Sequence, residues 1–207
     1  MSTQRIYLFK GFERFWHWAQ AALIIFMLVS GFEVHGSYTL MGFEKAVQLH
    51  TIAAWTLVGL WILAIFWHLT TGEWRQYIPT TERIVAVARF YSVGIFKGES
   101  HPFKPTVQRK HNPLQRLTYL LILVLVMPLI WITGWLYLFY GDWAAWGLGG
   151  LRLEAVAWGH TIGAFLMLAF LITHVYLITT GHTVFAHLKA MVTGWEEVHE
   201  DGAAKSA

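Results

Sequence analysis

Six histidines lie near the ends of three long apolar stretches of this sequence, and they are its most promising functional residues. They are His17, His35, His50, His68, His160 and His174. Two of them in one stretch are 14 or 18 positions apart, and at ~100° per residue such spacing places both on one face of an α-helix. A polar side chain in an apolar span is costly and generally functional. Imidazole nitrogens at two separate depths could therefore bind metal ions or a metal-containing cofactor.

The composition predicts that these stretches cross a membrane. The chain of 207 residues is 56% hydrophobic and 13% charged, against roughly 25% charged residues in soluble domains. Charge-free segments of this length are long enough for membrane helices, and they lack the alternation of a β-barrel strand. We expect a single all-α domain over 1–207, an integral membrane four-helix bundle. The predicted spans are about 12–35, 46–71, 113–140 (kinked near Pro128) and 155–181.

The distribution of basic residues predicts the orientation. Thirteen of the 15 Lys and Arg residues lie in the N-terminal segment, in the loop 73–116 or in the C-terminal tail. Positive residues remain in the cytoplasm. The sequence therefore predicts a multi-pass protein of the bacterial inner membrane with both termini cytoplasmic, in contact with lipid and not with nucleic acid. The loop 73–112 should contain an amphipathic helix near 81–96, on the inner leaflet or as a solvated connector, and the tail 196–207 should be disordered.

Alternating helix direction sorts the histidines into two layers. At cytoplasmic depth we expect His17, His68 and His174, and at periplasmic depth His35, His50 and His160. Two imidazoles from different helices can bind the iron of a haem from both sides. With no cysteine in the chain, iron–sulfur clusters and covalent c-type haem are excluded, so two layers suggest two b-type haems between the helices. Each layer offers three candidates for two positions, and a structural role for any one histidine is the alternative.

Three glycines inside the spans are compatible with this interpretation. Gly31, Gly134 and Gly163 lie at periplasmic depth. A missing Cβ allows a flat ring or another helix to approach the backbone, and helix packing is the commoner reason for glycine in a membrane span.

Four motifs together resemble a known family. They are FERFWHW (12–18), QLHTIAAW (48–55), KHNPLQRLTYL (110–120) and HTIGAFLMLAFLITHVY (160–176), within about 8–195. The set is similar to the prokaryotic membrane di-haem b-type cytochromes. That family includes the cytochrome b subunits of nickel–iron hydrogenases, the gamma subunits of membrane formate dehydrogenases and thiosulfate-reductase-associated cytochromes b.

The resemblance implies specific ligand pairs. It implies that His17 and His174 ligate the cytoplasmic-side haem, and that His50 and His160 ligate the periplasmic-side haem. His68 is an extra histidine relative to the formate dehydrogenase pattern; it could bind quinone, touch a haem propionate or replace His17.

The resemblance also implies that quinone binds near the start of the third span, where Asn112 and Gln115 match the family pattern. Asn112 could equally be the N-cap before Pro113.

The implied function is electron transfer between the quinone pool and a periplasmic redox subunit: a multihaem cytochrome, an iron–sulfur protein or a molybdenum enzyme. Substrate chemistry would then lie in partner subunits. One alternative is a stand-alone quinol oxidase that reduces oxygen or superoxide. A histidine-lined metal transporter is more remote, because transporters usually place their ligands at the midplane. The pattern assigns no role to His182 or His187.

Overall fold

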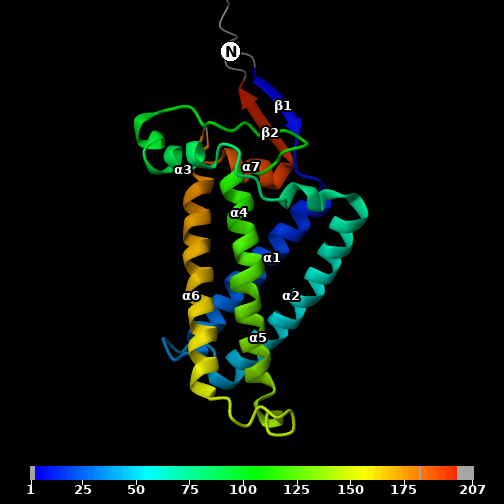
Figure 1. Cartoon of the computed structure of the whole chain (residues 1–207), viewed down its shortest axis with the longest axis vertical. Helices are drawn as coiled ribbons and strands as arrows, with labels where there is room; N and C mark the ends of the chain where they lie inside the picture. Colours follow the sequence, from blue (N-terminus) through cyan, green and yellow to red (C-terminus); the bar gives the residue numbers. More distant parts are fainter. Residues whose placement is uncertain (1–2, 182, 200–207) are drawn as a thin grey trace, which may run out of the picture. The chain divides into compact units, whose positions relative to one another are not determined.

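The computed structural model describes residues 3–181 and 183–199, and its long helices match the predicted spans closely (Figure 1). Four helical segments are long and apolar enough to cross a membrane: Gly11–Val34, Phe43–Thr71, Pro113–Leu138 and Leu153–Ile178. Their mid-span apolar side chains are largely exposed, as at Ile62 and Leu123, which is expected of surfaces that contact lipid. The prediction of an all-α membrane protein is confirmed.

The chain forms two compact units. The first contains the helical hairpin of α1 (Gly11–Val34) and α2 (Phe43–Thr71), which we call the first hairpin, together with the 3₁₀ segment η1 (Glu73–Tyr77) and α7 (Ala186–Thr193). In the second unit, α4 (Pro113–Leu121) continues through the π-helical segment η3 (Ile122–Val126) into α5 (Met127–Leu138). This continuous helix forms the second hairpin with α6 (Leu153–Ile178). In each hairpin the two helices run in opposite directions and contact each other (Figure 1).

The connection of the first hairpin is organised by a buried carboxylate. Glu33 lies in the last turn of α1, and one of its oxygens accepts the backbone N–H groups of Leu40, Met41 and Gly42 at 2.6–2.8 Å. Gly42 is the N-cap of α2 and has a φ of +89°, a conformation that glycine adopts without strain. Glu33 therefore helps to set where α2 begins.

The third span contains a local irregularity where proline predicts one. Residues Ile122–Val126 (η3) form a π-helical segment directly before Met127 and Pro128. Proline has no N–H to donate and crowds the preceding turn, and a wider turn accommodates it.

The helix expected near 81–96 is present and is shorter than predicted. It consists of α3 (Ile84–Ser92), followed by the 3₁₀ segment η2 (Gly94–Lys97). Val87 and Phe90 are buried, whereas Val85 and Phe96 are exposed. Its position on a leaflet stays a prediction.

The prediction of a disordered tail from 196 is wrong for its first residues. Strand β2 (Trp195–His199) pairs in antiparallel fashion with β1 (Thr3–Tyr7), with Arg5 opposite Glu197. The guanidinium of Arg5 also lies over the Trp195 ring, 5.7 Å from its centre. This pairing joins segments almost 200 positions apart, which no local pattern announces. Residues 200–207, the rest of the predicted tail, lie outside the described residues.

Candidate functional site

His50 is held by a hydroxyl of the neighbouring helix in the first hairpin. Its Nδ1 lies 3.0 Å from Oγ of Ser30. That hydroxyl lies 2.9 Å from the carbonyl oxygen of Phe26 in its own helix, and a hydroxyl that donates its single proton there can accept Nδ1–H of His50. Any iron at His50 would therefore bind through Nε2. Gly31, which follows Ser30, allows the imidazole ring of His50 to approach α1 closely. A Cβ at this position would lie 3.3 Å from Cε1 of His50.

His160 has the same support in the second hairpin. Its Nδ1 lies 3.0 Å from Oγ1 of Thr133 and 3.1 Å from the carbonyl oxygen of Ile130. The Thr133 hydroxyl donates to Leu129 O at 2.5 Å, so Nδ1 of His160 again carries the proton and Nε2 the lone pair. A Cβ on Gly134 would lie 3.3 Å from Cε1 of His160. Both arrangements match the way metal-ligating histidines are usually oriented through their other ring nitrogen.

Two of the three glycines in the spans make room for a ring, and the third makes room for a neighbouring helix. Gly31 and Gly134 each face an imidazole, whereas a Cβ on Gly163 would come within 2.5 Å of Ile130. Gly163 therefore serves close packing of α6 on α5. Ser30 and Thr133 were not among the predicted site residues; the signal that could have found them is a hydroxyl residue directly before each histidine-facing glycine.

His17 and His174 lie on different units. His17, on α1, packs edge-on against Trp18 at 5.1 Å, and His174, on α6, stacks on Phe170 at 5.6 Å. Both are half-buried. The pairings of His17 with His174 and of His50 with His160 join one unit to the other, and they stay predictions.

His68 occupies a buried aromatic cage within the first unit. Its Nδ1 donates to the carbonyl oxygen of Ala64 at 2.7 Å, and the ring is 9% exposed. The rings of Trp16, Trp67 and Tyr77 lie 5.0–5.4 Å from it. Because Nδ1 carries the proton, Nε2 is an acceptor, and among the described residues it has no hydrogen-bond partner. His68 can therefore accept a hydrogen bond from a bound ligand or bind a metal.

Asn112 and Gln115 form a capping box at the start of α4. Asn112 Oδ1 accepts the N–H of Gln115, and Gln115 Oε1 accepts the N–H of Asn112, both at 2.9 Å. Pro113 occupies the first turn. The N-cap interpretation is confirmed, and a quinone contact stays a prediction. Asn112 Nδ2 also donates to the Tyr91 hydroxyl at 3.3 Å; burial raises the pKa of Tyr91, and this bond only partly opposes it.

His35 and His187 are peripheral to these arrangements. His35 is exposed at the C-cap of α1, and His187 lies 3.6 Å from Glu196 in an ion-pair geometry. His182 lies outside the described residues. No three His, Asp or Glu side chains of the described part gather as a metal site, whereas the iron of a haem requires only two ligands from the protein.

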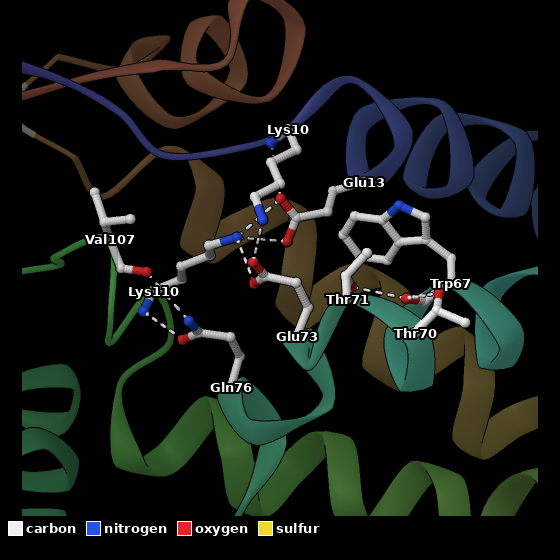
Figure 2. Close-up of polar contacts among 9 residues, drawn as sticks. All are labelled: Lys10, Glu13, Trp67, Thr70, Thr71, Glu73, Gln76, Val107 and Lys110. Carbon is white, nitrogen blue, oxygen red and sulfur yellow. Dashed lines mark hydrogen bonds and ion pairs between the residues drawn. The ribbon is translucent and has the colours of Figure 1, made fainter.

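A buried ion cluster joins both ends of the first hairpin to the segment before α4 (Figure 2). Lys110 Nζ lies 2.7 and 2.9 Å from the carboxylate oxygens of Glu13 and 3.0 Å from Glu73. Lys10 Nζ lies 2.5 Å from the other oxygen of Glu73, and the Lys110 side chain is 1% exposed. Two ammonium groups thus balance two carboxylates. In the sequence these lysines indicate only the topology.

The cluster predicts acid sensitivity. Burial raises the pKa of Glu73, whereas the hydrogen bonds and positive charges of Lys10 and Lys110 lower it. The lowering effects together are larger, so the pKa lies below its usual value. A carboxylate whose folded pKa is depressed contributes stability that is complete above its unfolded pKa, about 4.3, and is lost as the pH falls through the folded value. We expect the melting temperature in detergent to decrease below about pH 4, and Glu73→Gln to flatten this decrease. An unchanged acid profile in Glu73→Gln would contradict the assignment.

The chain is similar to known proteins. Residues 8–194 match the family described as prokaryotic cytochrome b561. The chain is also 32% identical over 202 residues to the Escherichia coli (strain K12) protein named "Putative cytochrome YdhU", a match that covers 93% of this chain and 75% of the relative. No solved structure shows a significant match.

Proposed function

Because this chain belongs to the prokaryotic cytochrome b561 family, we propose that it is a di-haem membrane cytochrome that carries electrons between the quinone pool and a redox partner on the periplasmic side. Membership of the family implies haem b and electron transfer in a multi-pass membrane protein. The number of haems, the quinone, the partner and the cytoplasmic position of both termini are our proposal.

The observation that carries this proposal is the common state of His50 and His160. Each ring donates Nδ1–H to a hydroxyl of the adjacent helix, so each offers the Nε2 lone pair that iron requires. Each ring also faces a glycine whose missing Cβ gives it room. Haem iron, when bound, exchanges one electron at a time. We assign His50 and His160 to the haem nearer the periplasm, and His17 and His174 to the other.

His68 is our strongest candidate for a quinone contact. A quinol that loses two electrons also loses two hydroxyl protons, so a site for it needs hydrogen-bond acceptors. Nε2 of His68 is such an acceptor, and the surrounding Trp and Tyr rings suit a flat apolar head group. Asn112 and Gln115 are weaker candidates, because their amide oxygens already cap α4.

Reduction of the purified chain by menadiol tests this proposal. We expect a reduced-minus-oxidised spectrum with low-spin b-type α-bands, two extractable haems per chain, and reduction of both by menadiol. His68→Phe keeps an aromatic ring in the cage and removes the acceptor. We expect this variant to bind both haems and react with menadiol roughly tenfold more slowly, which corresponds to one lost hydrogen bond.

The matched control is His35→Phe, in which an exposed histidine is replaced. A wild-type menadiol rate in His68→Phe would exclude His68 from the quinone site. Reduction by dithionite but not by menadiol would exclude the quinone step itself. A folded sample without haem would refute the electron-transfer proposal.

A further inference from the structure

We propose that Ser30 and Thr133 are positioning residues that lower the redox potential of one haem, by accepting Nδ1–H of its two axial histidines, His50 and His160. This inference rests on the ligand assignment of the proposed function. It gives Ser30 and Thr133 a role in setting the potential, beyond the orientation of His50 and His160 on which the proposed function relies.

The direction of the two hydrogen bonds follows from the acceptors around each hydroxyl. A hydroxyl has one proton to donate. Ser30 directs its proton to carbonyl oxygens of its own helix, at 2.9 Å to Phe26 and 3.3 Å to Met27. Thr133 directs its proton to Leu129 at 2.5 Å. Each hydroxyl oxygen can therefore accept Nδ1–H of the imidazole. For His160 the carbonyl oxygen of Ile130, 3.1 Å from Nδ1, supports this direction, because a carbonyl oxygen can only accept.

Burial makes these bonds effective. Ser30 is 0% exposed and Thr133 is buried as well, so water does not readily replace either hydroxyl if it is removed. In a medium of low polarity a hydrogen bond is electrostatically stronger than in water. The rings also have little freedom to turn away, because Gly31 and Gly134 lie directly against Cε1 of each imidazole.

Each pair occupies an equivalent position within its own hairpin. His50 is the eighth residue of α2 and His160 is the eighth residue of α6. Ser30 and Thr133 lie four and five residues before the ends of α1 and α5, the helices that precede the hairpin connections. At ~1.5 Å per residue, each imidazole lies equally far from the connected end of its own hairpin.

The sign of the effect follows from electron donation. An imidazole whose Nδ1–H is donated to an acceptor is a more basic ligand at Nε2. A more basic ligand stabilises ferric iron more than ferrous iron, and it lowers the potential. Removal of either hydroxyl should therefore raise the potential of the haem.

Potentiometric titration of each haem in the purified full chain tests this. We compare Ser30→Ala, Thr133→Val and the double variant, with haem counts taken on the same samples. Loss of an outer-shell partner of a ligating histidine typically lowers metal affinity or activity by about 10–100-fold, and we take the lower end for the difference between ferric and ferrous iron. We expect Ser30→Ala to shift the ferric-to-ferrous equilibrium by about tenfold, which for one electron is about 59 mV. Thr133→Val should give a smaller shift, because the carbonyl oxygen of Ile130, 3.1 Å from Nδ1 of His160, remains as an acceptor. Both shifts should be upward and in the same haem, with the other haem unchanged and a larger shift in the double variant.

Two controls separate the hydroxyl from side-chain volume and from general effects. Thr133→Ser keeps the hydroxyl and should retain the wild-type potential. Thr56→Val removes an exposed α2 hydroxyl that donates to Ile52 O at 2.8 Å, and it should change neither haem.

Unchanged potentials in Ser30→Ala and Thr133→Val, at full haem content, would overturn the inference. If the two variants shift the potentials of two different haems, His50 and His160 do not ligate the same iron. Failure of the proposed function gives a different result, because His50→Ala and His160→Ala would then both retain two haems.

Discussion

Replacing His50 or His160 by alanine should remove one haem per chain and leave the second in place. Alanine has no nitrogen to bind iron, and the partner ligand alone holds a non-covalent haem weakly. Both variants should lose the same haem, with identical residual difference spectra. The measurement is haem extraction per polypeptide, together with the reduced-minus-oxidised spectrum of the purified chain.

The remaining haem is also the evidence that each variant is folded. His35→Ala is the matched control, because His35 is exposed at the end of α1, and it should retain both haems. Imidazole added to the buffer should partly restore the missing haem in His50→Ala. The ligand assignment fails if His50→Ala and His160→Ala each retain two haems.

Replacing Lys110 by methionine should destabilise the protein strongly. Methionine preserves an unbranched apolar stem but removes the ammonium group that bridges Glu13 and Glu73. Lys10 still contacts Glu73 and is half-exposed. The buried carboxylate of Glu13 loses the ammonium group with which it pairs. Breaking a buried ion pair from one side typically costs about 3–5 kcal/mol. Denaturant titration in detergent, followed by the α-band of bound haem, measures this loss.

A charge-balanced variant distinguishes the ion pair from simple packing. Glu13→Gln added to Lys110→Met removes the carboxylate left unpaired, and it should recover a large part of the lost stability. Lys189→Met provides the surface control, since Lys189 and Glu197 form an exposed pair at 3.6 Å that contributes at most about 1 kcal/mol. Equal stabilities for Lys110→Met and Lys189→Met would contradict the structural role of the cluster.

Patterns among neighbouring residues predict much of the fold. Hydropathy locates the four spans to within a few residues, because a helix that crosses a membrane must be apolar along its own length. The capping box at Asn112 and Gln115 is similarly local, since its bonds span three residues. The irregular turn before Pro128 follows from the chemistry of one residue.

Contacts between distant segments were beyond the reach of these patterns. Ser30 is 20 residues from His50, and Thr133 is 27 residues from His160. Lys110 and Glu13 are 97 residues apart. In the sequence, nothing distinguishes Ser30 from any other polar residue in a membrane span. Lys110 is likewise one of several basic residues in its loop. Strand β2 was missed for the same reason, because its partner β1 lies at the other end of the chain.

The sequence by itself determined a membrane protein of four helices, without thiol chemistry and with histidines near the helix ends, because hydropathy, composition and helical spacing act over neighbouring residues. Only the tertiary structure decided the state of those histidines. Hydroxyls of the neighbouring helix are placed to accept Nδ1–H of His50 and of His160, and an aromatic cage buries His68. The buried ion cluster, too, exists only where folding brings opposite charges out of water together.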